Sequence, residues 1–473
     1  MSGFFTVGEK KDRPGIYKRR ENIGSVETAG AREGIGAAVV KGNWGPLGVA
    51  SVVDAAEDYR KYVGTGTGYD VLTELFKGGV QTAVVVRVGT GGTQASVKLN
   101  DNAETGVPVL TVTAKYPGTF PLSVSVKASL ADSTTKVVTI YTGTTVLESV
   151  SLVSGTKEVD EAVEAFADSA YVKVSKIAAG SGTLKEVTQV ELTGGADPTV
   201  KTEDYSAAFN VANTEIWDSI CVDTNDTDVH ALLASFVDRI FNAGDYPLAT
   251  VSEPVSVDLA DRETHCAAFN DEKMHYVIDG WTDANGNTYD GYIAAARIAG
   301  MIGAIAANDS LTHKTIDGAV GLAEAMTNSD IVKAIKAGGL VISKSKSGQV
   351  MIEKGINTLT TLSGDMDQGW KKIRRTKTRF EMMSRIDETL EAFVGAVNND
   401  DDGRASIIAA GQGVLDAMIG EGKLLSGATF SLDDTNPPSG DSAWFVIQAD
   451  DIDSFETGYL TYQFRFTAPA EEE

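Results

Sequence analysis

Two cysteines and four histidines are the residues of this chain best suited to nucleophilic or metal chemistry. His265 and Cys266 are adjacent in the stretch THCAAF, and the carboxylates Asp258, Asp261 and Glu263 precede them closely. A cysteine nucleophile needs a base that the fold positions beside it, and neighbours on a chain do not usually face each other. A hydrolase with a site around His265 and Cys266 is kept as an alternative, which requires that the fold bring such a base to the thiol. The simpler interpretation is that both cysteines are small buried residues.

Metal and nucleotide motifs have the wrong spacing in this sequence. The histidines are not paired at zinc-binding intervals, and no Cys-x2-Cys pair accompanies them. The glycine stretches GTGTGYD and VGTGGT do not complete a dinucleotide fingerprint, and Gly-x4-Gly-Lys-Ser/Thr does not occur. DANGNTYDG begins like a calcium loop but has Thr288 at its sixth position and Ala294 at its twelfth. We therefore expect no catalytic residue, no cofactor and no metal.

The segment WKKIRRTKTRFEMMSRIDETLEAFVGAV, residues 370–397, combines a helical pattern with an unusual order of charges. Its apolar residues recur at steps of three, four and seven, which predicts one long helix. Cations fill its first half and anions follow, although the helix macrodipole favours the opposite order. We interpret the first half as a docking surface for an acidic protein partner, with a solvated face and, more weakly, nucleic-acid binding as alternatives. The predicted docking residues are Lys371, Lys372, Arg374, Arg375, Lys377 and Arg379.

Composition indicates a large, acidic, globular protein. Hydrophobic residues make up 42% of 473 residues, which is enough for a sizeable core. The net charge of −25 opposes nonspecific binding to phosphates. The first residues contain no apolar core of a signal peptide, and the most apolar stretch, residues 293–307, is too short to span a bilayer and includes Arg297. We expect a protein that stays where it is made and binds neither nucleic acid nor membrane.

Patterns along the chain predict an α/β and α+β multidomain protein. Residues 26–90 and 200–345 alternate buried strands with helices, as in an α/β domain. Residues 91–199 are rich in Thr, Val and Ser with strand periodicity, which predicts an all-β domain inserted into it. Residues 346–455 predict a C-terminal α+β domain. A module whose β insertion recognises glycans is another alternative, and the missing export signal counts against it.

Both ends of the chain, residues 1–25 and 456–473, are predicted to be extended arms. The first is polar and basic and contains the turn sequence DRPGIY. The last contains YLTYQFRF, whose period of two predicts a half-buried strand. The apolar face of this strand consists of Leu460, Tyr462, Phe464 and Phe466. The pattern alone leaves open whether the strand pairs within its own molecule or with another.

Several stretches together resemble one family. They are DRPGIY near the start, LTGGADPTVKTEDYSAAFNVANTEIWDSICV where the α/β pattern resumes, and KGINTLTTL followed by WKKIRRTKTRFEMMSRIDETLE. These are similar to the tail sheath proteins of contractile phage tails and R-type tail-like bacteriocins, particularly the defective-prophage type of Gram-positive bacteria. The likeness spans nearly the whole chain. It is weakest in the β insertion and strongest over residues 355–385.

This resemblance implies a mechanical, non-enzymatic role. Sheath subunits of the family form stacked hexameric rings around a tail tube and contract to drive the tube through a bacterial envelope. The implied partners are the protein itself, the tube protein, the baseplate and the tail terminator. The C-terminal domain of the family faces the tube, which gives the basic helix from Lys371 that position. The implied particle is assembled in the bacterial cytoplasm, as part of a virion tail or a released tail-like particle.

The resemblance also implies that the arms exchange strands between subunits. Neighbouring subunits of the family add their terminal strands to a sheet on a third, which yields a mesh that survives contraction. The implied intersubunit residues are Pro14, Gly15, Ile16, Tyr17, Leu460, Tyr462, Phe464 and Phe466.

Overall fold

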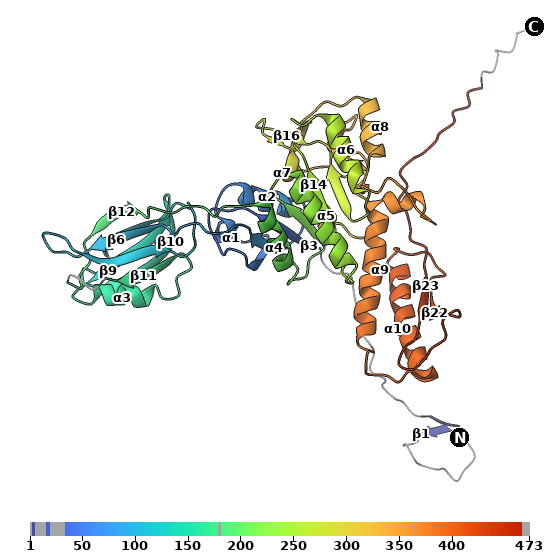
Figure 1. Ribbon diagram of the computed structural model, residues 1–473, viewed down its shortest axis with the longest axis horizontal. Coiled ribbons are helices and arrows are strands. Elements are labelled where there is room, and N and C mark those ends of the chain that lie inside the picture. The colour runs from blue at the N-terminus through green and yellow to red at the C-terminus, as the bar shows by residue number, and fades with distance from the viewer. Residues whose placement is uncertain (1, 5–15, 19–33, 178–180, 365, 466–473) are drawn as a thin grey trace, which may run out of the picture. The chain divides into compact units, whose positions relative to one another are not determined.

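A computed structural model of the chain (Figure 1) describes residues 2–4, 16–18, 34–177, 181–364 and 366–465. The chain separates into two compact units. The larger unit contains Arg32–Thr378 and Asp453–Glu473, and the smaller unit contains Met1–Ala31 and Arg379–Ile452. The boundary between Thr378 and Arg379 lies within one helix, α9 (Ile373–Glu391).

A seven-stranded sheet forms the centre of the larger unit, in the order β19-β15-β14-β13-β3-β5-β4. Every neighbouring pair is parallel except the edge pair β4 and β5. The run IGAAVV of β3 and the four residues AVVV inside β5 are apolar because a parallel sheet is covered on both faces. The strands are β3 (Ile35–Val40), β4 (Ala50–Asp54), β5 (Thr82–Arg87), β13 (Ser219–Val222), β14 (Leu248–Ser252), β15 (Met274–Val277) and β19 (Gly339–Leu340).

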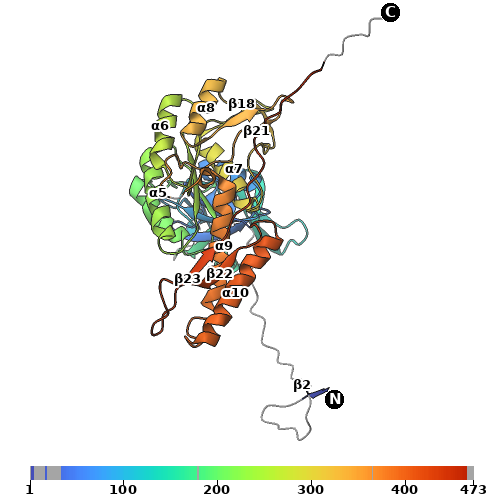
Figure 2. The same ribbon diagram turned by 90° about the vertical axis from the view of Figure 1, so that its right-hand side faces the viewer.

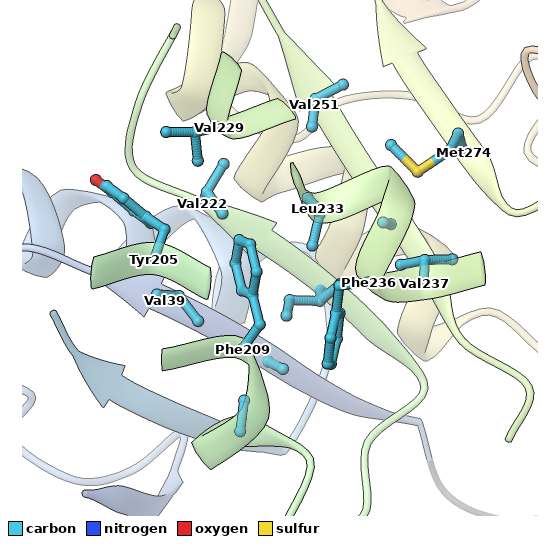
Figure 3. Packing of buried hydrophobic residues seen from close by; sticks show 14 of the residues in the cluster. Val39, Tyr205, Phe209, Val222, Val229, Leu233, Phe236, Val237, Val251 and Met274 are labelled. Carbon is cyan, nitrogen blue, oxygen red and sulfur yellow. The ribbon is translucent and has the colours of Figure 1, made fainter. Parts of the chain in front are cut away.

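Helices cover both faces of this sheet, as predicted for an α/β domain. On one face, Leu75 of α2 (Thr67–Lys77) and Ala299 of α7 (Gly291–Ala304) share a core with alternate residues of β3 and β5. On the other face, Phe209 and Phe236 lie between the helices and the strands, as Figure 3 shows. The helices of that face are α4 (Thr202–Ala212), α5 (Thr227–Phe241), α6 (Leu259–Phe269) and α8 (Asn328–Lys336).

The most apolar stretch, residues 293–307, forms the mostly buried helix α7 as far as Ala304, and its one charged residue, Arg297, is 4% exposed. Its guanidinium donates twice to one carboxylate oxygen of Glu74, at 2.9 and 2.6 Å, and lies over the ring of Trp281. A buried charge of this kind needs a partner, and here the pair joins α7 to α2.

The residues between β5 and α4 form the predicted all-β insertion. Two sheets face each other across a common core, one in the order β10-β9-β8-β12 and the other β11-β7-β6. One short helix, α3 (Glu158–Ala165), was not expected from the strand-rich pattern. The strands are β6 (Ser96–Asn100), β7 (Pro108–Ala114), β8 (Ser123–Ala128), β9 (Thr135–Thr142), β10 (Thr145–Val153), β11 (Val172–Lys176) and β12 (Val187–Glu191).

The insertion is joined to the seven-stranded sheet by the loop that follows β3. Trp44 of this loop is buried in the core of the insertion, with its ring centroid 5.2 Å from that of Tyr116 and 5.4 Å from that of Phe120. Arg87, at the end of β5, donates to the loop and to the carbonyl of Pro117 in the insertion. Its burial lowers its pKa to about 10.

The smaller unit packs two long helices against a strand pair, as Figures 1 and 2 show. The helices are α9 (Ile373–Glu391) and α10 (Asp401–Gly420), and the antiparallel strands are β22 (Thr429–Leu432) and β23 (Phe445–Gln448). The prediction that one helix continues to residue 397 was wrong. Beyond Glu391 the chain turns, with Gly395 in a left-handed conformation and Val394 83% exposed, so no core residue holds another turn.

Short elements complete the described chain. Strand β16 pairs with β17 and β18, and β20 pairs with β21. A single 3-10 turn, η1 (Gln368–Lys371), precedes α9, and a single helical turn, α1 (Arg60–Val63), precedes α2. The bounds of the strands are β16 (Trp281–Asp283), β17 (Thr288–Tyr289), β18 (Ala319–Leu322), β20 (Ile342–Lys344) and β21 (Val350–Ile352).

Candidate functional site

Residues 457–465 carry large apolar side chains that are almost fully exposed. Leu460 is 78% exposed, Tyr462 74% and Phe464 79%. Although the alternation predicts a strand, residues 459–465 form none in this single chain, and Figure 2 draws them as an extended coil. Apolar surface of this kind marks an interaction site. Pairing with another molecule stays a prediction, and Phe466 lies outside the described residues.

The N-terminal arm contains one short strand pair. Strand β1 (Ser2–Phe4) runs parallel to β2 (Ile16–Lys18), with Ile16 opposite Ser2 and Tyr17 opposite Gly3. The other two predicted arm residues, Pro14 and Gly15, lie outside the described residues. The intersubunit role of all four stays a prediction.

The six predicted docking cations lie at the start of α9 and just before it, and all six are only partly exposed. Lys371 donates to the carbonyl of Thr360 at 2.8 Å, and Arg375 lies 2.9 Å from the carboxylate of Asp367. A freely solvated face, one of the alternatives, does not describe side chains that are bound in this way. Docking to a partner stays a prediction.

Lys377 explains part of the unusual charge order. Its ammonium group donates to the carbonyls of Ile302, Gly303 and Ile305, at the end of α7, with 2.7 Å to the last of them. Helix C-termini carry unpaired carbonyls and a partial negative charge, so a cation is favoured there. The lysine that is badly placed for the dipole of its own helix is well placed for the dipole of α7.

The remaining three cations of the set differ in how they are bound. Lys372 pairs with acidic residues of the C-terminal segment, Asp453 among them, at 2.8 Å. Arg379 lies 3.9 Å from the carboxylate of Asp451, within the smaller unit. Arg374 is only partly exposed, and its Nε has no hydrogen-bond partner among the described residues.

A compact ion network occupies the second half of α9. Arg385 holds both carboxylate oxygens of Glu421 at 2.8 Å, and Lys423 lies 2.6 Å from Glu421 and from Glu381. The hydrogen bond from Arg385 is the main reason why the pKa of Glu421 falls to about 2. This network joins α9 to the turn after α10 and is internal to the smaller unit.

His265 and Cys266 do not form a nucleophile and base. The Nδ1 atom of His265 is 2.6 Å from Glu253 Oε2, and the hydroxyl of Tyr276 donates to the same oxygen at 2.6 Å. Cys266 is buried, its thiol donates to the carbonyl of Ala337, and burial raises its thiol pKa. A raised pKa suppresses the thiolate that attacks substrates. Cys266, like Cys221, is a small buried residue, as the simpler interpretation predicted.

Three buried carboxylates that no motif search identified lie at the carboxyl edge of the seven-stranded sheet. Asp223, Glu253 and Asp279 follow the adjacent parallel strands β13, β14 and β15. The signal in the sequence is the acid that ends each apolar run, in ICVD, TVSE and YVID. Asp223 accepts hydrogen bonds from the hydroxyl of Tyr205 and the amide of Lys41, which close the loops over the sheet edge.

These carboxylates do not form a metal site. In the described part of the chain, no group of three or more His, Cys, Asp or Glu residues is arranged to hold a metal ion.

Among the described residues, no helix is both long and apolar enough to cross a membrane.

Family models match two adjacent stretches of the chain. Residues 90–197 match the phage tail sheath protein beta-sandwich domain, and residues 198–358 match the phage tail sheath protein central domain. The phage-like element PBSX protein XkdK of Bacillus subtilis strain 168 is 22% identical over 404 residues, which cover 83% of this chain and 82% of XkdK.

Solved structures share the fold. A sheath tail protein from Desulfitobacterium hafniense gives a TM-score of 0.72 at 19% identity, and the match covers 93% of this chain and 100% of that one. The helical sheath of the anti-feeding prophage in its contracted state gives a TM-score of 0.55 at 10% identity, over 96% of this chain and 99% of that one.

Proposed function

This chain belongs to the phage tail sheath protein family, and from that premise we propose that it is the structural subunit of a contractile injection tail. Subunits polymerise as stacked hexameric rings around a tail tube, and contraction drives the tube through a bacterial envelope. Besides other copies of itself, the subunit contacts the tail tube protein, the baseplate and the tail terminator. Assembly takes place in the bacterial cytoplasm, and the product is a phage virion tail or a released tail-like particle.

The exposed C-terminal arm is the observation that carries this proposal. The alternation places Leu460, Tyr462 and Phe464 on one face, and this segment has no strand partner among the described residues, which suits strand addition to a second copy. The pair of β22 and β23 is a two-stranded sheet, which gains stability from further strands. We propose this sheet as the acceptor of the arm.

Strand addition suits a sheath that changes shape. Main-chain hydrogen bonds between the arm and its acceptor do not depend on contacts with the tube, so the mesh persists while those contacts break. Contacts between charges on the surface contribute only about 0 to 1 kcal/mol each, and they can be given up in steps. The work of contraction comes from strain stored in the extended assembly, as in other switches, and needs no cofactor or catalytic residue.

Removal of the arm tests the proposal. The full chain, purified alone, is expected to form tubes or rings that are visible by negative-stain electron microscopy. Deletion of residues 457–473 should abolish them without changing the melting temperature, because the described side chains of this segment are exposed in the single chain. A truncated chain that unfolds would show that the arm is internal. A full-length chain that stays monomeric at high concentration would contradict the sheath function.

A matched pair of variants separates arm length from arm chemistry. Replacing Leu460 and Phe464 with Ser keeps the length but removes the apolar face, and should prevent tube formation. Replacing Thr461 and Gln463, on the opposite face, with Ser should leave tubes intact.

A further inference from the structure

The C-terminal segment is bound to the larger unit immediately before it becomes exposed. The Nζ atom of Lys372 lies 2.8 Å from Asp453 Oδ2 and 3.2 Å from Glu456 Oε2. The other carboxylate oxygen of Glu456 accepts a hydrogen bond from Thr312 Oγ1 at 3.0 Å and another from Ser454 Oγ at 3.1 Å. All five residues belong to the larger unit.

Exposed and partly buried residues alternate over 453–456, and from residue 457 onward the described chain is exposed without a break. The side chain of Glu456 is 11% exposed and that of Lys372 is 17% exposed, whereas every residue over 457–465 is exposed. The hydroxyl of Thr312 also accepts a hydrogen bond from the amide of Gly355 at 3.0 Å, which fixes its orientation. Glu456 therefore marks the end of the bound segment.

We infer that Lys372, Thr312 and Glu456 form an anchor that transfers the pull of the C-terminal arm into the larger unit. This inference rests on the proposed function, in which the arm is held by a neighbouring subunit. In sequence, the arm follows β23, which belongs to the smaller unit. Without the anchor, a pull on the arm reaches β23 and its partner β22 first. With it, the pull reaches the start of α9 and the loop around Thr312.

The chemistry of the anchor suits this task. Both oxygens of Glu456 are bound, one by a cation at 3.2 Å and one by two hydroxyl groups at 3.0 and 3.1 Å, and hydrogen bonds to an ionised group are stronger than those between neutral groups. Burial shields the ion pair from salt, in contrast to a pair on an open surface. Release of the anchor frees residues 453–456 and lengthens the arm by about 13 Å, which lowers the effective concentration at the acceptor.

Cleavage of the unassembled full chain tests whether the anchor exists. Phe455 is 88% exposed between anchored neighbours, and Tyr459 is 94% exposed beyond them, so chymotrypsin can cleave at an exposed aromatic residue on either side of Glu456. Glu456→Gln and Lys372→Met should raise the ratio of cleavage after Phe455 to cleavage after Tyr459 about fivefold, because about 1 kcal/mol of local restraint is lost. Arg60→Met is the matched control, since it breaks an ion pair of the larger unit, Arg60 with Asp58, that involves neither the arm nor the predicted docking residues. An unchanged ratio in both anchor variants would refute the anchor.

Assembly tests whether the anchor transfers force. The two anchor variants should raise the threshold concentration for tube formation about fivefold and shorten the tubes that survive shear, whereas Arg60→Met should do neither. A raised cleavage ratio with an unchanged threshold and unchanged tube length would mean that the contact holds the arm without carrying load. Failure of the wild-type chain to form tubes would count against the proposed function, and the cleavage ratio would still decide the anchor.

Discussion

One of the buried carboxylates at the carboxyl edge of the seven-stranded sheet, Asp279, makes stability depend on pH. Asp279 accepts the amide of Ile342 at 2.8 Å through one oxygen, while its other oxygen has no partner among the described residues. Burial raises its pKa well above the ordinary value, against the opposing effects of this hydrogen bond and of Arg262. The folded chain therefore keeps this proton at a pH where the unfolded chain has lost it.

Because the folded chain binds this proton and the unfolded chain does not, the stability of the folded chain falls as pH rises. As pH rises from the ordinary pKa of about 4 towards the raised pKa of Asp279, the free energy of unfolding falls by up to about 1.4 kcal/mol per pH unit. Asp279→Asn removes this loss, so the variant should gain stability relative to the wild type as pH rises. Urea denaturation of the chain without residues 457–473, repeated between pH 4 and pH 8, measures the gain. A constant difference across that range would contradict it.

Asp283 provides the control of opposite sign. Hydrogen bonds, chiefly from the side chain of Asn287, lower its pKa to about 2. Its contribution is present above the ordinary pKa and is lost as pH falls towards 2, so Asp283→Asn should not reproduce the gain at high pH.

The loop that follows β3 connects the insertion to the seven-stranded sheet, because its residue Trp44 is part of the core of the insertion. Trp44→Ala removes a ring that packs on Tyr116 and Phe120, and a buried Trp of this size contributes about 3–5 kcal/mol. We expect faster amide hydrogen exchange in β6 to β12, with the seven-stranded sheet less affected. Trp281→Ala is the size-matched control, because Trp281 is as buried but stacks on Tyr289. Equal exchange in both variants would mean that the insertion folds independently of the loop.

Sequence patterns predicted the elements that carry their own burial signal. The strands IGAAVV and TAVVVR are predicted from the unbroken apolar residues that form all of the first and the middle of the second, and α7 from a long apolar run with a single charge. YLTYQFRF alternates equally clearly, but an alternating pattern does not show which strand it pairs with. Over residues 459–465 no strand is formed in the single chain.

Contacts between distant residues were beyond sequence patterns. Thr312 and Glu456 are 144 residues apart, and neither belongs to a motif. The basic run before and within α9 was noticed, but its partners were not, because the carbonyls of α7 and the carboxylates of the C-terminal segment reach it only through the fold. The dipole argument indicated only that the stability of α9 by itself does not account for the charge order.

In the whole molecule, the six cations that we propose as the tube-docking surface differ in how they are bound within their own chain. Arg375 and Lys377 are bound within their own chain, so their replacement disturbs the fold as well as any docking. Arg374 has no ion pair in the part of the chain described, although it is only partly exposed. It is therefore the residue that tests docking most directly.

Replacement of Arg374 with Glu should weaken attachment of the sheath to tail tubes, because it reverses a charge at the proposed contact. Assembly of the sheath alone should be unchanged. Co-sedimentation of sheath with purified tubes at several salt concentrations measures the attachment, and the melting temperature monitors the fold. Lys346→Glu, a charge reversal on an exposed lysine of the larger unit, is the control. Attachment equal to that of the wild type would remove Arg374 from the docking surface.

The two connections of the insertion run antiparallel beside each other. The amide of Thr90 donates to the carbonyl of Thr199 at 2.8 Å, and the amide of Thr93 donates to the carbonyl of Ala196 at 2.9 Å. The chain thus leaves the α/β domain and returns to it at one place, where hydrogen bonds join its two connections. A domain whose ends lie this close together can be exchanged for one of another size or surface without moving the points at which the flanking chain begins and ends.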